Sequence, residues 1–118
     1  MKNGFYLTSL TLLLVLAGCA TKVPFTGESH ADGPLKSDIS QHLIMQAKLY
    51  AKCNQVESIQ TQVLKINPVG TGPSIASQQY GSVEERWLVQ LCDRQIPFLV
   101  TLTPDGAGGT FFGLSREQ

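Results

Sequence analysis

The chain has 118 residues, and its nine basic and nine acidic residues give a formal net charge of zero at pH 7. Its Lys and Arg residues are scattered without a cluster, whereas proteins that bind nucleic acid or acidic lipid headgroups usually carry a basic patch. Composition and charge therefore argue against both of these partners, and the length is that of one small domain.

The N-terminus has the pattern of a secretory signal. Lys2 supplies one positive charge, and an almost wholly apolar run follows from Phe5 to Ala17. This run is shorter than the roughly 20 residues that a membrane-spanning helix needs. A charged start, a short apolar stretch and a small-residue exit are typical of a cleaved signal peptide. The alternatives are an ordinary secretory signal that happens to contain a cysteine, and a short membrane anchor.

The exit from this run, LAGC at 16–19, resembles the lipobox of bacterial lipoproteins. The resemblance implies that residues 1–18 are removed, that Cys19 receives a diacylglyceryl group, and that its new amino terminus is usually acylated. Two or three acyl chains, at about 0.8 kcal/mol per buried CH₂, hold a protein firmly in a bilayer. In such lipoproteins, Ala20 after the cysteine implies export to the outer membrane, where the domain would face the periplasm.

Two further cysteines, Cys53 and Cys92, remain once Cys19 is lipidated. In an oxidising periplasm they have one possible intramolecular pairing. A bridge that closes about 40 residues would stabilise a small domain by roughly 4 kcal/mol in the loop-entropy model. Two free thiols or a metal site are the alternatives, but two cysteines and two remote histidines have no recognisable metal-ligand spacing. We therefore expect a Cys53–Cys92 disulfide, no metal and no cofactor.

The mature chain is expected to begin with a flexible tether over 19–36, because this stretch contains Pro and Gly and lacks periodicity. The folded domain is expected over 37–118. Ser37 is an ordinary N-cap candidate, and apolar residues then recur at spacings of three and four, which predicts a helix over about 38–53. His42 and Lys48 should face water, and the helix should lie on a sheet rather than bind a partner. The expected core-facing side chains are Ile39, Leu43, Ala47 (or Met45), Tyr50 and Cys53.

The rest of the domain has the pattern of an antiparallel meander. Segments that alternate with period two, one of them imperfectly, predict strands that are joined mostly by short turns. The predicted strands cover about 56–66, 83–92, 96–103 and 110–114. The connection over 69–81 is long enough to be functional or disordered. The expected fold class is α+β: one N-terminal helix packed on an antiparallel meander of about four strands, pinned by one disulfide.

The C-terminal part carries a second resemblance. The segment ERWLVQLC at 85–92, with the Gly-rich segment 104–110 behind it, is similar to the tail of small uncharacterised proteobacterial lipoproteins. Those often have the pattern W-x-V-x-x-C-G, and Asp93 stands here in place of the Gly. The resemblance implies a shared fold and no known activity.

The sequence predicts no catalytic residues. One histidine lies in the tether and the other on the exposed helix face, and no G-x-S-x-G motif is present. Glu84 and Glu85 are neighbours on a strand and therefore point to opposite faces. Asp93 and Asp105 lie in turns, where Asp is common for backbone reasons. The GAGG run at 106–109 lacks the ending and the helix of a phosphate-binding loop, so we expect a hairpin turn.

Trp87 has two interpretations. It is either a core residue under the helix, or part of an exposed aromatic patch with Phe98, Phe111 or Phe112 that binds a protein partner. Phe111 and Phe112 should face opposite sides of their strand, so that one of them can lie outside the core and recruit another strand at an edge. The candidate partner-binding residues are therefore Trp87, Phe111 and Phe112.

These patterns together predict a non-enzymatic lipoprotein that is held at the periplasmic face of the outer membrane. It would bind an envelope protein as an accessory subunit, through the Trp87/Phe112 surface or the loop 69–81. The alternative is a small-ligand carrier or sensor with an apolar pocket between helix and sheet, lined by Leu43, Tyr50, Val89 and Val100. A hydrolase or a hydrolase inhibitor has no support in the sequence.

Overall fold

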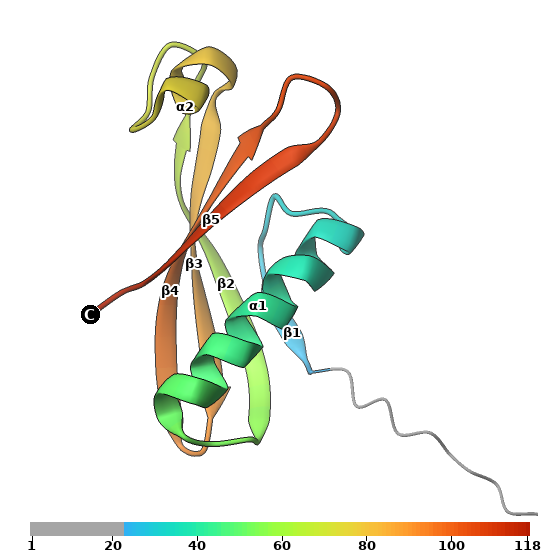
Figure 1. Ribbon diagram of the computed structural model, residues 1–118, viewed down its shortest axis with the longest axis vertical. Helices are drawn as coiled ribbons and strands as arrows, with labels where there is room; N and C mark the ends of the chain where they lie inside the picture. Colours follow the sequence, from blue (N-terminus) through green and yellow to red (C-terminus); the bar gives the residue numbers. More distant parts are fainter. Residues whose placement is uncertain (1–22) are drawn as a thin grey trace, which may run out of the picture.

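The structure is a computed structural model that describes residues 23–118 (Figure 1). Its elements are β1 (Phe25–Gly27), α1 (Gly33–Ala51), β2 (Val56–Asn67), α2 (Ile75–Tyr80), β3 (Ser82–Leu91), β4 (Arg94–Pro104) and β5 (Thr110–Arg116). The strands form one sheet in the order β1-β2-β3-β4-β5, and α1 lies across one face. The predicted α+β class, with a helix on an antiparallel meander, is confirmed. The predicted signal peptide 1–18 and the lipidation site Cys19 lie outside the described residues.

The segment before the helix is part of the fold. β1 pairs with β2 in parallel, with Phe25 opposite Ile59, and α1 supplies the crossover that a parallel pair requires. β1 ends at Gly27, which has a φ of 96° and lies so close to the Thr61 carbonyl that a Cβ would collide with it. Of the predicted tether over 19–36, residues 23–36 therefore belong to the folded domain, which begins before the predicted boundary at residue 37.

The helix α1 also begins earlier than predicted, at Gly33. Asp32 is its N-cap, and the Asp32 Oδ1 accepts a hydrogen bond of 2.9 Å from the Leu35 amide. Pro34 favours the first helical turn because its missing N–H has no intrahelical partner there. The predicted cap, Ser37, lies inside the helix.

The buried face of α1 is narrower than predicted. Ile39, Leu43 and Ala47 are fully buried, as expected, but Met45 and Tyr50 are 55% and 49% exposed. Tyr50 lies in the last turn, where its ring packs under the guanidinium of an arginine instead of entering the core. The helix ends at Ala51, so the predicted end at residue 53 is two residues too late.

The predicted loop 69–81 contains a short helix, α2. Ser74 caps it by accepting a hydrogen bond of 3.0 Å from the Ser77 amide. The Ser77 side chain is fully buried, donates to the Thr71 carbonyl at 3.2 Å and shares a hydrogen bond with the Ser82 hydroxyl. Polar contacts hold α2 in place, and for this reason a search for apolar periodicity does not find it.

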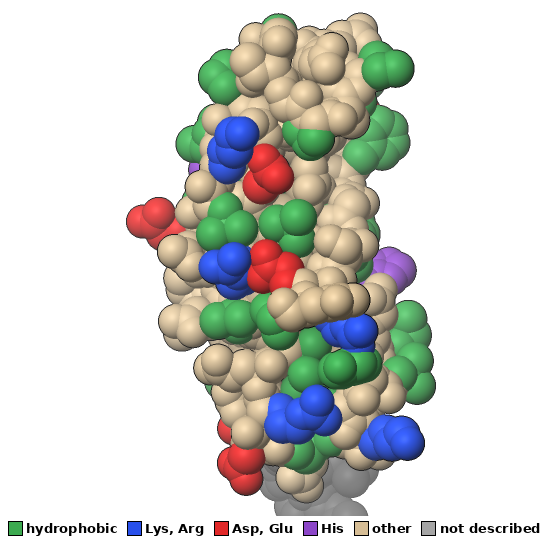
Figure 2. Space-filling model, turned by 90° about the vertical axis from the view of Figure 1, so that its left-hand side faces the viewer, with side chains coloured by type: hydrophobic (Ala, Val, Ile, Leu, Met, Phe, Trp, Pro, Cys, Tyr) green, Lys and Arg blue, Asp and Glu red, His purple; other side chains and the backbone are tan. Residues whose placement is uncertain are grey.

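The sheet has one face that packs against α1. The alternation predicted for β3 and β4 is confirmed over most of each strand, since every second side chain is buried from Glu85 to Leu91 and from Ile96 to Leu102. The buried apolar residues of the sheet are Ile59, Trp87, Val89, Leu91, Ile96, Phe98, Val100 and Leu102. Seen from one side of the molecule, hydrophobic, acidic and basic side chains are interspersed (Figure 2). Within residues 23–118, no helix is long and apolar enough to cross a membrane.

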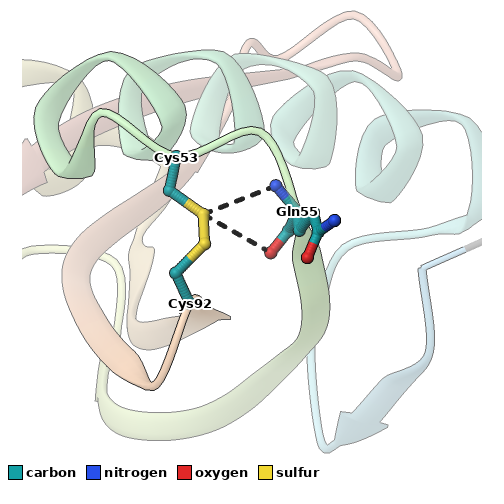
Figure 3. The surroundings of a disulfide bond; sticks show 3 residues. All are labelled: Cys53, Gln55 and Cys92. Atoms are coloured by element: carbon teal, nitrogen blue, oxygen red, sulfur yellow. Dashed lines mark hydrogen bonds between the residues drawn. A yellow bond between two sulfur atoms is a disulfide. The ribbon is translucent and has the colours of Figure 1, made fainter.

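The predicted Cys53–Cys92 disulfide is confirmed (Figure 3). Cys53 follows the end of α1, and Cys92 with Asp93 forms the two-residue turn between β3 and β4, with φ values of 44° and 58°. Positive φ at both positions suits a tight hairpin whose strands twist normally. The Gln55 amide donates a hydrogen bond of 3.4 Å to the Cys53 Sγ. The disulfide thus joins the end of the helix to the tip of a hairpin.

We expect replacement of both Cys53 and Cys92 by Ala to destabilise the domain by about 4 kcal/mol, because the bridge restricts the unfolded chain. Urea unfolding followed by Trp87 fluorescence measures the change. Dithiothreitol should lower the unfolding midpoint of the native protein to that of the double variant, and should leave the variant unchanged. Equal midpoints without reductant would contradict a stabilising role.

Candidate functional site

The most unusual polar group inside the domain is the carboxylate of Glu85, which is fully buried on β3. It accepts hydrogen bonds from the Ser29 hydroxyl at 2.6 Å, the His30 amide at 2.9 Å and the Trp87 indole N–H at 3.1 Å. The Ser29 Oγ also accepts the Ala31 amide at 3.0 Å. This Glu85 cluster therefore fastens the connection between β1 and α1 to the sheet.

The Glu85 cluster is suited to a structural role. A buried carboxylate is tolerated only when donors compensate for its lost hydration, and here three donors surround it. No part of the side chain reaches solvent. The neighbouring Glu84 lies on the opposite face and accepts a hydrogen bond of 2.9 Å from Asn67 Nδ2. The two carboxylates therefore do not converge on one point, as the strand pattern predicted.

The Glu85 cluster was not foreseen from the sequence. The sequence did indicate that Glu85 is buried, because Glu85 stands between Val83 and Trp87 in the alternating pattern, at a position that faces the core. Its partners Ser29 and His30 lie 56 and 55 residues away, in the segment that we expected to be a tether.

Trp87 belongs to the core. It is fully buried, and the edge of the Phe25 ring meets it at a centroid distance of 5.2 Å and an interplanar angle of 74°. The core interpretation is confirmed, and the exposed-patch interpretation is wrong for Trp87 and for Phe98, which is 1% exposed. Both residues lie under α1 at facing positions of β3 and β4.

Phe111 and Phe112 face opposite sides of β5, as predicted. Phe112 is half-buried against the core, with the ring of His42 at a centroid distance of 5.7 Å. Phe111 is 64% exposed. Of the three candidate partner-binding residues, Phe111 alone has the exposure that a binding surface requires.

The four residues expected to line an internal pocket do not do so. Leu43, Val89 and Val100 are fully buried in one packed cluster, and Tyr50 lies outside it. A groove of about 570 Å³ lies instead beside α1, between the helix and the strands β1 and β2. Its walls include Phe25, Lys36, Ile44 and Ile59.

Large apolar side chains are exposed at two ends of the molecule. One set lies at the end of β2, on α2 and at the start of β5, and we call it the apical surface. The apical surface consists of Leu64, Ile66, Val69, Ile75, Tyr80 and Phe111. The other set, Met45, Leu49 and Tyr50, lies in the C-terminal half of α1. Figure 1 places α2 and the C-terminal end of α1 at opposite ends.

The β4–β5 loop is held by its own backbone contacts. Asp105 Oδ1 accepts the amides of Ala107 at 2.7 Å and Gly109 at 2.9 Å, which confirms the predicted hairpin turn and the backbone role of Asp105. Gly106, with a φ of 81°, lies so close to the Tyr80 ring that a Cβ would not fit. The loop therefore packs on α2 and forms part of the same end as the apical surface.

Two further features concern charged and metal-ligating groups. The Arg86 Nε donates to Glu117 Oε2 at 2.7 Å and ties the chain after β5 to β3. The hydrogen bond from Arg86 lowers the pKa of Glu117 below its ordinary value, and the same bond raises the pKa of Arg86. Among the residues that the structure describes, no three His, Cys, Asp or Glu side chains come together as metal ligands.

Comparisons of this chain with protein-family models, with curated proteins and with solved structures give no match.

We expect Glu85→Ala to destabilise the domain by about 3 kcal/mol, because buried donors lose their acceptor. Urea unfolding measures the loss, and a red shift of the Trp87 emission reports the altered surroundings of the indole. The matched control is Glu57→Ala at an exposed position of β2, which should leave the midpoint within error. Equal effects of the two substitutions would show that the Glu85 cluster does not hold the fold.

The Arg86–Glu117 ion pair should make the stability of the domain fall at acidic pH. Because Glu117 has a lowered pKa in the folded state, its contribution to stability is present above the unfolded-state pKa and is lost as the pH falls through the folded-state pKa. NMR titration of the Glu117 carboxyl should show its pKa rising towards the ordinary value in Arg86→Gln. Lys65→Gln on β2 is the control and should leave the Glu117 pKa unchanged.

Proposed function

We propose that the protein is a non-enzymatic lipoprotein, held by Cys19 at the periplasmic face of the outer membrane, and that its apical surface binds another protein of the cell envelope. The LAGC sequence at 16–19 supports the lipid anchor. The Cys53–Cys92 disulfide is in keeping with an oxidising compartment. The exposed apolar side chains of the apical surface are the observation that carries the binding role.

The exposure of these side chains favours a protein partner. Ile75, Val69 and Phe111 are 85%, 69% and 64% exposed. Apolar residues that gather at one end of a small domain cost solubility unless another surface covers them. The residues at the centre of a protein–protein interface are most often large and apolar or aromatic, as are the residues of the apical surface.

An open strand edge adjoins the apical surface. β1 pairs with β2 only at residues 59–61, whereas β2 continues to Asn67. Beyond residue 61, the β1 side of β2 has no strand partner within the described part of the chain. A strand of the partner could pair there while its side chains contact Leu64 and Ile66. This arrangement supports an accessory subunit that recognises an extended segment.

A small-ligand carrier or sensor is the second candidate. The groove between β1, α1 and β2 favours it, because the apolar residues Phe25, Ile44 and Ile59 line it together with the ammonium of Lys36. Lys36 Nζ lies 4.4 Å from the centroid of the Phe25 ring. The groove is open along the helix, and so a ligand would remain partly exposed to solvent.

In-cell photocrosslinking tests the proposal. A photoreactive amino acid at Ile75 or Ile66 should capture one dominant envelope protein, and the exposed position Gln46 on α1 should not. Ile75→Glu should abolish capture from Ile66, because a charge at the interface disfavours binding. Cys19→Ala should remove the protein from the outer-membrane fraction. Capture from Gln46 equal to that from Ile75 would contradict the apical site.

A further inference from the structure

If Cys19 carries the lipid, as proposed above, the domain lies close to the bilayer. Val23 is already part of the folded domain, where it packs against the core. Three residues lie between Cys19 and Val23, so the four Cα–Cα steps that join them span at most about 14 Å when fully extended. One surface of the domain must therefore remain near the lipid headgroups.

The chain leaves the domain beside the C-terminal half of α1. Val23 and Pro24 line a groove of about 580 Å³ together with Ile44, Lys48 and the start of β2. A second groove, of about 420 Å³, continues around the helix from Ile44 to Met45 and Leu49. This half of α1 is therefore within reach of the bilayer.

Apolar and basic side chains share one face of this half of α1. Lys48 and Leu49 follow Met45 at spacings of three and four residues, which places these three on one side of α1. Lys52 follows directly after the helix as its C-cap. Met45 is 55% exposed and Leu49 75% exposed. Exposed apolar residues flanked by lysines are typical of helices that lie in a membrane interface.

Two arginines add positive charge at the same end. The guanidinium of Arg116 lies 3.6 Å from the centroid of the Tyr50 ring, and that of Arg94 lies 5.7 Å from it. Neither arginine forms an ion pair within residues 23–118. The acidic residues at this end are Asp93, Glu57 and Glu117, of which Glu117 is paired with Arg86. They are outnumbered by Lys48, Lys52, Arg94 and Arg116.

We propose that this end of the domain rests on the phospholipid bilayer. We call it the basal surface and define it as Met45, Lys48, Leu49, Tyr50, Lys52, Arg94 and Arg116. Met45 and Leu49 enter the boundary between headgroups and acyl chains, and the four cations contact lipid phosphates. These cations come from separate parts of the chain, and the fold brings them to one end.

Lipid photocrosslinking tests the proposal. The full-length lipidated protein is reconstituted in vesicles of phosphatidylethanolamine and phosphatidylglycerol that contain a photoreactive phospholipid, and the crosslinked residues are mapped by mass spectrometry. Crosslinks should concentrate on the basal surface and be absent from Ile75. A Met45→Glu, Leu49→Glu double variant should lose crosslinks at the basal surface. Arg94→Gln, which removes one cation, should reduce the yield of these crosslinks by about five-fold.

The control is Val69→Glu, Ile75→Glu at the apical surface, which should leave the basal crosslinks unchanged. All variants should float with the vesicles, because the acyl chains hold them there. The mass of the Cys19 peptide separates the two proposals. An acylated protein whose crosslinks are spread evenly over both ends overturns the basal surface alone, whereas an unacylated Cys19 overturns the lipid anchor and the basal surface with it.

Discussion

The domain depends on keeping α1 across the inner face of the sheet. Three of its side chains, Ile39, Leu43 and Ala47, are fully buried, and within residues 23–118 α1 is the long helix that covers Trp87 and Phe98. The helix also packs the partly buried side chains of Leu35, Ile44 and Ala51 against the same core. Both of its ends are fixed by other means. The Glu85 cluster fastens the segment before it, and the Cys53–Cys92 disulfide fastens the segment after it.

Fixing α1 at both ends also separates the surface into two parts. The C-terminal half of the helix extends its exposed residues Met45 and Leu49 to one end of the molecule, beside the disulfide. The sheet continues beyond the helix at the other end, where α2 and the β4–β5 loop meet through Tyr80 and Gly106. Apolar residues exposed at both ends suit a domain that has to contact two different surroundings.

The sequence predicted the features that rest on local pattern. Alternation located β3 and β4 and placed Trp87 among the inward residues, and cysteine number identified the disulfide. Sequence patterns failed to predict the elements whose stabilising contacts come from residues far away in the chain. The stretch from Phe25 to Ala31 has no apolar periodicity of its own, and so its sequence predicts a tether. Its order comes from contacts with Ile59 and Glu85. The same limit hid the apical and basal surfaces, because their residues come from separate elements.

The corrected start of the domain changes what a lipid at Cys19 would do. A tether over 19–36 would let the domain move freely above the bilayer, so that no face had a preferred direction. In the structure, β1 and the Glu85 cluster make residues from Val23 to Ala31 part of the rigid body. The remaining four residues restrict distance and orientation together. A lipid at Cys19 would then hold the proposed basal surface at the headgroups and direct the apical surface away from the bilayer, where the exposed residues Ile75 and Phe111 would be open to the proposed partner.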